Sequence, residues 1–194
     1  MRGERMWQTL RLCTILSSTN RTKYLKNKHI FGAIGEDCNV MSRTVPLYAK
    51  LIRLGNNVRL ASRVSFVTHD VTHVMLNANP TLKGESFQEK LGCILIEDNV
   101  FVGSGTSILY GVRIGSNVII GAGSLVNKDI PPNSVAAGVP ARVIGTFDDY
   151  VAKRRSEPKY PAELSPGQET LSDEAAEWFW KEFYRTHEKA DGLK

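Results

Sequence analysis

The chain has 194 residues, of which 25 are Lys or Arg, 20 are Asp or Glu, four are His and three are Cys. A content of 42% hydrophobic and 23% charged residues is typical of a soluble globular protein and excludes a disordered chain. No apolar stretch approaches the roughly 20 residues of a membrane span, and Arg11 interrupts the apolar N-terminal segment, so we expect no signal peptide. The widely spaced Cys13, Cys38 and Cys93 indicate a reducing, cytoplasmic environment without a disulfide framework.

The net charge of +5 is unevenly distributed along the chain. Residues 1–50 carry +6, residues 51–146 carry +2 and residues 147–194 carry −3. Such an asymmetry fits a nucleic-acid patch, an anionic ligand or subunits that pack head to tail. The N-terminal basic residues are dispersed and rarely alternate with aromatic ones, so we expect no nucleic-acid partner.

Apolar residues at loosely helical spacing predict one or two short helices within residues 4–28. We expect residues 1–30 to form a helical cap over the open edge of the following domain, residues 31–146, because an exposed edge invites aggregation. His29, in this basic region, is expected to be solvated.

A six-residue repeat begins after this cap, loosely at first. Apolar residues mark its first position at Ile34, Val40, Leu54, Leu60 and Phe66, and the gap from Val40 to Leu54 predicts an insertion near Pro46. The repeat is then lost over residues 72–92, which are polar and contain Asn-Pro and Lys-Gly turn signals. We predict a structureless loop there that leaves the repeat domain, and its length makes it a candidate functional loop.

From Ile96 the repeat is strict for six units, with Ile or Val at every first position. It predicts a three-sided coil of short strands, about eighteen residues per turn, with the first and fifth positions pointing inward. Turn positions are expected to adopt positive φ. The candidates are Asn99, Asn117, Gly103, Gly115 and Gly121.

The remaining chain, residues 147–194, is predicted as a C-terminal helical extension. Residues 147–156 form a short helix in this prediction, and a second helix runs from Leu171 to about Lys189, with Ser172 as its cap. Its aromatic face must be buried on the coil or on a neighbouring subunit, whereas His187 is expected to be solvated. The aromatic residues are Trp178, Phe179, Phe183 and Tyr184.

The segments VIIGAGSLVNKDIP (118–131) and AAGVPARVIG (136–145) resemble the hexapeptide-repeat acyltransferases, especially the sugar O-acetyltransferases and the xenobiotic acetyltransferases. This resemblance implies an all-β core folded as a left-handed parallel β-helix with a protruding loop. It also implies a homotrimer with active sites between subunits. The expected activity is transfer of an acetyl group from acetyl-CoA to a hydroxyl of a sugar or saccharide precursor.

His69 is the candidate general base, because it precedes the long loop and imidazole titrates near neutral pH. It also occupies the place where members of the family carry a catalytic His. Asp70 and Glu97 are alternative groups that could orient its ring. For His73, a contact with substrate and a plain loop position both remain open.

The family motifs assign five further residues to acetyl-CoA. Ser104 would lie near the thioester and Ala122 would offer backbone contacts, whereas Asn127, Lys128 and Arg142 would meet the phosphates and the adenine end. Lys and Arg suit phosphate oxygens because their hydrogen bonds are charge-assisted. Two positions depart from the family pattern. Members of the family often carry Trp at the position of Phe101 and a second basic residue at the position of Gly145.

Other functions compete with sugar O-acetylation. A zinc enzyme of the gamma carbonic anhydrase type needs three His per metal, and only His69 and His73 lie near the coil, so we expect no metal. N-acetylation of an amino sugar and O-acetylation of a xenobiotic remain open. A trimeric scaffold without activity is the non-enzymatic alternative.

Overall fold

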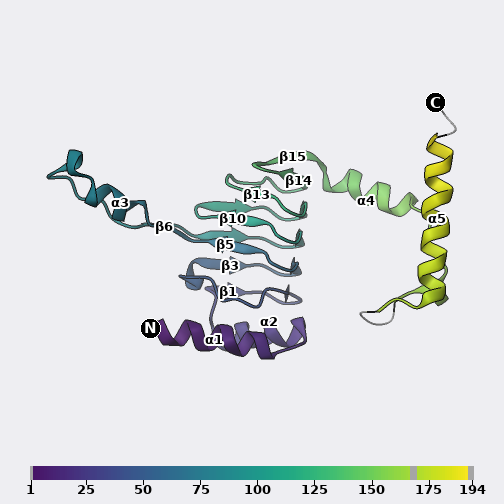
Figure 1. The fold of residues 1–194 in the computed structure, drawn as a ribbon, viewed down its shortest axis with the longest axis horizontal. Coiled ribbons are helices and arrows are strands. Elements are labelled where there is room, and N and C mark those ends of the chain that lie inside the picture. The colour runs from purple at the N-terminus through teal and green to yellow at the C-terminus, as the bar shows by residue number, and fades with distance from the viewer. Residues whose placement is uncertain (1, 167–169, 192–194) are drawn as a thin grey trace. The chain divides into compact units, whose positions relative to one another are not determined.

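The structure is a computed structural model that describes residues 2–166 and 170–191 (Figure 1). The chain divides into two compact units, Met1–Ala152 and Lys153–Lys194. No helix within the described residues is long and apolar enough to cross a bilayer.

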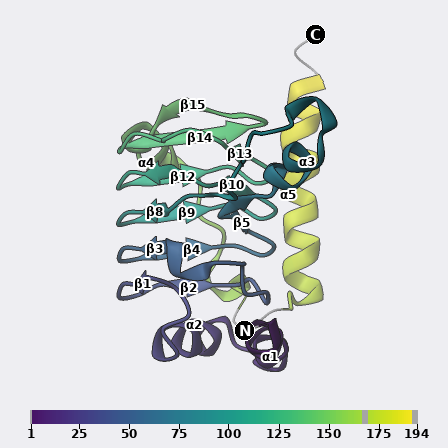
Figure 2. The same ribbon diagram turned by 90° about the vertical axis from the view of Figure 1, so that its left-hand side faces the viewer.

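Two helices precede the first strand of the larger unit, as the spacing of the apolar residues predicts. They are α1 (Arg2–Thr14) and α2 (Ser18–Asn27). Leu12 and Leu25 are buried in the main core, and the backbone N–H of Val40 donates to the hydroxyl of Thr22 at 2.8 Å. The guanidinium of the buried Arg21 donates to the carbonyls that follow α1. The helices therefore cover the first turn of the coil (Figure 2).

The coil itself is three parallel sheets, and consecutive strands of one turn lie in different sheets. Ile94 pairs with Val112, so one turn takes 18 residues, as the six-residue repeat predicts. The first sheet contains β1 (Ala33–Ile34), β3 (Ile52–Leu54), β8 (Ile94–Ile96) and β11 (Val112–Ile114). The second contains β2 (Asn39–Val40), β4 (Val58–Leu60), β9 (Val100–Val102), β12 (Val118–Ile120), β14 (Ser134–Gly138) and, antiparallel, β15 (Ala141–Thr146). The third contains β5 (Ser65–Val67), β10 (Ser107–Leu109) and β13 (Leu125–Val126).

Two corners of this coil border the third sheet, and they position the site described below. The chain enters the third sheet at the entry corner, residues 61–64, 103–106 and 121–124 in successive turns. It leaves at the exit corner, residues 68–93, 110–111 and 127–129. In the described part of the chain, the first turn has no strand in the third sheet. Residues 41–51, which end in the 3₁₀ turn η1 (Ala49–Leu51), take its place and form the insertion predicted near Pro46.

The predicted inward positions of the strict repeat are all buried, which confirms the ladder pattern. Removal of these stacked Ile and Val side chains from water is the main driving force for the coil. The first-position residues are 0% exposed and the fifth-position residues at most 5% exposed. They are Ile96, Val102, Ile108, Ile114, Ile120 and Val126 at the first position, and Val100, Thr106, Val112, Val118, Ser124 and Ile130 at the fifth.

The turn prediction is right for the asparagines and wrong for the glycines. Asn99 and Asn117 have φ of 58° and 57°, and the side-chain amide of Asn99 donates to that of Asn117 at 3.1 Å. Gly103, Gly115 and Gly121 do not have positive φ. They are glycines because neighbouring turns approach closely, and a Cβ at Gly103 would lie 2.4 Å from the backbone N of the next turn.

Residues 72–92 are not the structureless loop that we predicted. They form an arm that projects from the coil (Figures 1 and 2). The arm contains α3 (Thr72–Ala78) and the 3₁₀ turn η2 (Pro80–Leu82). Its stem is formed by the pairing of β7 (Lys90–Leu91) with β6 (His69–Asp70), which precedes the arm. Local polar side chains organise it. The side chain of Asn77 hydrogen-bonds the backbone N and O of Phe87, both at 2.9 Å.

The helices predicted beyond the coil are present. They are α4 (Phe147–Ser156) and, after the 3₁₀ turn η3 (Ala162–Leu164), α5 (Asp173–Asp191). The hydroxyl of Ser172 accepts from the backbone N–H of Ala175 at 3.2 Å, as expected for the cap. The aromatic residues of α5 contact one another, and Trp180 and Tyr184 remain 59% and 57% exposed.

Candidate active site

His69 lies at the exit corner, two residues after the end of β5, where the chain leaves the coil for the arm. Its backbone pairs with Leu91 in the stem of the arm, and its side chain is half-buried. Its Nδ1 atom is buried and has no hydrogen-bond partner among the described residues. The ring of Tyr48 packs against the imidazole at right angles, with 5.4 Å between ring centroids.

The two carboxylates that we considered as orienting groups bind other partners. Asp70 accepts from the backbone N–H of Thr72 at 2.7 Å and from the hydroxyl of Tyr110 at 3.2 Å. The hydrogen bond from the backbone of Thr72 is the main reason that the pKa of Asp70 lies below its usual range. Asp70 therefore fixes the base of the arm rather than the ring of His69.

Glu97 forms an ion pair with Arg113 on the neighbouring turn. The Arg113 guanidinium donates to its Oε1 through Nε at 2.7 Å, and the hydroxyl of Ser116 donates to Oε2 at 3.1 Å. The hydrogen bond from Arg113, followed by that from Ser116, lowers the pKa of Glu97. This carboxylate links two turns of the coil and has no hydrogen bond to His69.

Tyr48 and Glu89 are site residues that the sequence analysis missed. The hydroxyl of Tyr48 donates to both carboxylate oxygens of Glu89, at 3.2 and 3.0 Å. This hydrogen bond raises the pKa of Tyr48, so the hydroxyl stays protonated and remains a donor. Both residues lie outside the six-residue repeat, one in the insertion of the first turn and one in the arm, so the repeat could not have identified them.

Three of the residues assigned to acetyl-CoA lie together at the entry corner. Ser104 and Ala122 occupy equivalent places in successive turns, because the backbone N–H of Gly123 donates to the carbonyl of Ser104 at 2.8 Å. Arg142 pairs with Ala137 in the hairpin above them. A Cβ on Gly121 would lie 2.8 Å from the Cβ of Ala137, so this hairpin packs directly on the Ala122 turn. Ser104 and Arg142 are exposed, and Ala122 is also reached by solvent.

The other two, Asn127 and Lys128, lie at the exit corner with His69 but higher in the coil. Both side chains are exposed, and Lys128 has no ion pair with any residue that the structure describes. Stacked turns are about 4.8 Å apart, and Lys128 lies two turns above the His69 turn. The uncompensated cation is therefore roughly 10 Å along the axis from the candidate base.

The site residues thus form two groups at opposite edges of the third sheet. One face of the coil is about six residues wide, which corresponds to roughly 15–20 Å between its corners. Exposed cations stand at both corners, Arg142 at the entry corner and Lys128 at the exit corner, and the small side chains of Ser104 and Ala122 leave room for a ligand beside Arg142. The group at the exit corner includes His69, whose ring holds the basic nitrogen that could accept a proton.

The structure also places the other residues that the sequence singles out. Phe101 is 45% exposed on β9. Gly145 lies in the hairpin and supplies no second cation, although a Cβ at this position would have no other heavy atom within 4 Å. His73 is part of α3, and its Nδ1 is buried and unpaired among the described residues. In residues 2–166 and 170–191 no group of three or more His, Cys, Asp or Glu is arranged to hold a metal.

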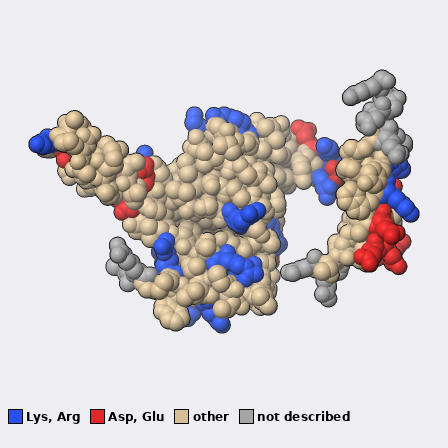
Figure 3. Space-filling view, in the orientation of Figure 1, with Lys and Arg blue, Asp and Glu red and all other residues tan. Residues whose placement is uncertain are grey.

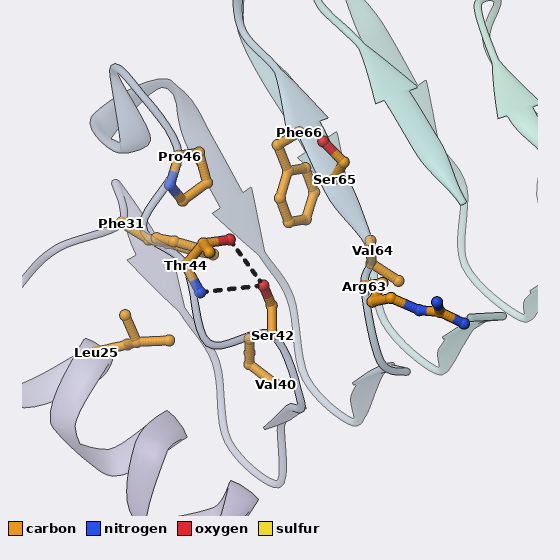
Figure 4. Close-up of a pocket in the computed structure, with 10 residues that line it drawn as sticks. All are labelled: Leu25, Phe31, Val40, Ser42, Thr44, Pro46, Arg63, Val64, Ser65 and Phe66. Carbon is orange, nitrogen blue, oxygen red and sulfur yellow. Dashed lines mark hydrogen bonds between the residues drawn. The ribbon is translucent and has the colours of Figure 1, made fainter. Parts of the chain in front are cut away.

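A cavity of about 270 Å³ lies below β5, where the first turn lacks a strand in the third sheet (Figure 4). Its walls are mostly apolar core side chains. Ser42 and Thr44 hydrogen-bond each other at 3.3 Å, and the guanidinium of Arg63 points away from the cavity. The lining residues are Leu25, Phe31, Val40, Ser42, Thr44, Pro46, Arg63, Val64, Ser65 and Phe66.

Lys and Arg side chains are spread over the visible face of the coil, Asp and Glu form small groups near the base of the arm, and a larger acidic group lies on α5 (Figure 3). The acidic residues of the arm stem include Asp70 and Glu89, which are already bonded to tyrosine hydroxyls. On this face the basic side chains form several separate groups rather than one continuous patch.

The chain has clear relatives among proteins of known sequence. A family described as bacterial transferase hexapeptide (six repeats) matches residues 94–128. The chain is 36% identical to a galactoside O-acetyltransferase of Lactococcus lactis over 63% of its length and 66% of that protein. It is 46% identical to the galactoside O-acetyltransferase of Escherichia coli over 50% of its length. The match covers 45% of the latter, so the chain spans about half to two thirds of these relatives.

Solved structures show the same similarity. A maltose O-acetyltransferase from Clostridium difficile is 30% identical, with a TM-score of 0.53 over 75% of this chain and 85% of that one. A hexapeptide-repeat acetyltransferase from Vibrio cholerae, complexed with acetyl coenzyme A, is 25% identical with a TM-score of 0.50, over 75% and 86% of the two chains. The chain therefore belongs to the hexapeptide-repeat acyltransferases, and within them it is similar to the galactoside and maltose O-acetyltransferases.

Proposed function

We propose that the protein transfers an acetyl group from acetyl-CoA to a hydroxyl of a sugar or saccharide precursor, with His69 as the general base. The observation that carries this proposal is the placement of His69. It is a half-buried imidazole at the exit corner, next to the arm, and neither Asp70 nor Glu97, the two carboxylates considered as orienting groups, is bonded to it. It is therefore free to accept a proton from an acceptor.

The chemistry needs a base and no covalent enzyme intermediate, because a thioester is already activated. His69 takes the proton of the acceptor hydroxyl as its oxygen attacks the carbonyl carbon of the thioester. The carbon–sulfur bond then breaks, and the imidazolium returns the proton to the departing thiolate. Ser104 is our candidate for a polar contact near the thioester, where negative charge develops on the carbonyl oxygen.

We assign the donor to the two corners of the third sheet. Ser104 and Ala122 would contact the pantetheine arm, and Arg142 and Lys128 would bind phosphate oxygens together with Asn127. The exposed, uncompensated cations support this assignment. The acetyl coenzyme A in the complex of the Vibrio cholerae relative supports the same donor.

We further propose a left-handed coil and a homotrimer with active sites between subunits. The wide separation of the two residue groups supports the second part. A thioester held at the entry corner would lie roughly 15–20 Å from the His69 of its own chain. A neighbouring subunit that packs against this face could bring its own His69 within reach. The free cysteines fit a cytoplasmic location for this assembly.

An acceptor screen tests the proposed activity. The protein is mixed with acetyl-CoA and with sugars, nucleotide sugars, amino sugars and hydroxylated xenobiotics, and release of free thiol is recorded. Turnover with neutral sugars is expected, and turnover only with amino sugars or xenobiotics would select those alternatives. A thermal shift by acetyl-CoA separates the enzyme from a scaffold, because a scaffold that binds no acetyl-CoA would show none. Absence of both thiol release and a thermal shift would refute the proposal.

A further inference from the structure

A general base must hold its imidazole in one orientation, and His69 lacks the usual means. Catalytic and metal-binding imidazoles are commonly fixed by a hydrogen bond from one ring nitrogen to a carboxylate or a carbonyl. The Nδ1 of His69 is buried without such a partner among the described residues. Asp70 and Glu97 are bonded to other groups. Another contact must therefore restrict the ring.

The aromatic ring of Tyr48 packs against the imidazole ring of His69. The two rings are perpendicular, with an interplanar angle of 86° and 5.4 Å between centroids. Edge-to-face packing of this kind is favourable beyond the area it buries, and it limits rotation of both rings. Tyr48 is 38% exposed, so it borders the surface from which an acceptor would approach.

The backbone of Tyr48 is tied to the strand that carries His69. The hydroxyl of the fully buried Thr68, next to His69, donates to the carbonyl of Leu47, next to Tyr48, at 2.6 Å. Tyr48 itself has φ of 51°, and its carbonyl accepts from the backbone N–H of Leu51 at 2.9 Å. The tyrosine thus stands at a fixed place in the insertion of the first turn.

The other end of the Tyr48 side chain is anchored in the arm. Its hydroxyl donates to both carboxylate oxygens of Glu89, which lies directly before β7. The pairing of β7 with β6 fixes the backbone of His69 against the same segment. Tyr48, His69 and Glu89 therefore come from three segments that meet at the exit corner.

We propose that Tyr48 is a positioning residue for His69 and that Glu89 anchors the Tyr48 ring in the required orientation. This inference rests on the proposed role of His69 as the base. The insertion and the arm, both outside the six-residue repeat, act together to hold the imidazole. A change in the position of the arm would consequently change the orientation of the base.

The test uses Tyr48→Leu, Tyr48→Phe and Glu89→Ala in the full chain, with Tyr150→Leu as a control of similar exposure, 41%. Tyr48→Leu is expected to lower kcat about tenfold or more, with the KM for acetyl-CoA within about twofold, since a misplaced reacting group costs rate rather than donor binding. Tyr48→Phe keeps the ring and should restore kcat to within about threefold of the original protein. Glu89→Ala frees the ring and should lower kcat about threefold.

A second measurement does not depend on turnover. In protein with isotope-labelled histidine, the His69 ring signal is assigned by its absence in His69→Ala. It should be single and sharp in the original protein and exchange-broadened or doubled in Tyr48→Leu, because the ring then samples several rotamers. Tyr48→Phe and Glu89→Ala, which both lose the hydrogen bond between Tyr48 and Glu89, should broaden the signal to a lesser extent. Circular dichroism confirms that each variant is folded. Should Tyr48→Leu fail to fold, the ring signal and kcat of Glu89→Ala decide the question.

The outcomes separate this inference from the proposed function. If His69→Ala is inactive while Tyr48→Leu and Glu89→Ala keep full kcat and a sharp His69 signal, the positioning role is wrong and the base assignment stands. If His69→Ala turns over at the original rate, the base assignment itself fails. A loss in kcat for Tyr150→Leu equal to that for Tyr48→Leu would also overturn the inference.

Discussion

Replacement of Gly103 by Ala tests why glycine occurs at the corners of this coil. The structure gives two distinct reasons for glycine. Gly103 has an ordinary φ, but a Cβ there would lie 2.4 Å from the backbone N of Ala122 and 2.7 Å from its Cα. Gly105, two residues later, has φ of +72° and open space around the Cβ direction. Gly145 has neither restriction.

The magnitudes follow from these three environments. Ala reduces the freedom of the unfolded chain and by itself stabilises by about 0.4–1 kcal/mol. At Gly103 the overlap with backbone forces two turns apart, which costs about 1–3 kcal/mol or more, for a net loss of about 2 kcal/mol. At Gly105 the left-handed conformation costs about 1–2 kcal/mol, for a net loss of about 0.5–1 kcal/mol. Gly145→Ala should be neutral or slightly stabilising.

The assay is urea unfolding followed by circular dichroism, at one protein concentration because association would add to the apparent stability. The expected order of unfolding midpoints is Gly103→Ala lowest, Gly105→Ala next and Gly145→Ala highest. A Gly103→Ala protein as stable as Gly145→Ala would show that the close approach of the turns is not what requires glycine. Equal losses at Gly103 and Gly105 would contradict the expected order, because the overlap at Gly103 would then cost no more than the left-handed conformation at Gly105.

Three further predictions concern the site and the coil. His69→Ala should lower the rate of thiol release about 10²–10⁴-fold while acetyl-CoA affinity and oligomeric state persist; an unchanged rate would remove His69 from the reaction. Lys128→Ala and Arg142→Ala should each raise the Kd for acetyl-CoA about tenfold, as for a lost charge-assisted hydrogen bond, and calorimetry that shows unchanged Kd values would contradict their phosphate role. The lowered pKa of Glu97 means that its bond to Arg113 stabilises the fold above the ordinary carboxyl pKa of about 4.3 and is lost as pH falls through the folded value. Glu97→Gln should thus be less stable than the original protein at pH 7, with the difference narrowing as pH falls below the ordinary carboxyl pKa, and a pH-independent difference would disprove this linkage.

The core of the coil could be predicted because the repeat and the burial are the same pattern. Every first position from Ile96 to Val126 is buried, since a three-sided coil with 18 residues per turn places each sixth residue on the axis side. The asparagines at the corners could be predicted for a local reason, namely their tolerance of positive φ. Each of these features depends only on the type of one residue and on its position in the six-residue repeat, and both can be read from the sequence.

Other features depend on neighbours that the repeat does not specify. Gly103 is required by the backbone of a residue 19 positions later, Ala122, so its own turn signal was misleading. The arm is ordered by side-chain bonds such as that between Asn77 and Phe87, and such bonds have no periodicity. Tyr48 lies in an insertion, where the frame gives no register, and its contact with His69 could not be inferred from spacing.

The division of the site between two corners was, in contrast, within reach of the sequence. Positions 18 residues apart stack on the same corner, and Ser104 and Ala122 differ by 18, as do Tyr110 and Lys128. The six-residue frame alone therefore separates the entry-corner residues from Lys128. His69 escapes this arithmetic because the arm of residues 72–92 interrupts the frame after it, and only the pairing of β5 with β10 shows that it leaves the third sheet at the corner below Tyr110. The arm that borders His69 is thus also what hides the register of His69 in the repeat. A regular repeat with one projecting arm is sufficient to bring a titratable group to the edge of an otherwise uniform surface.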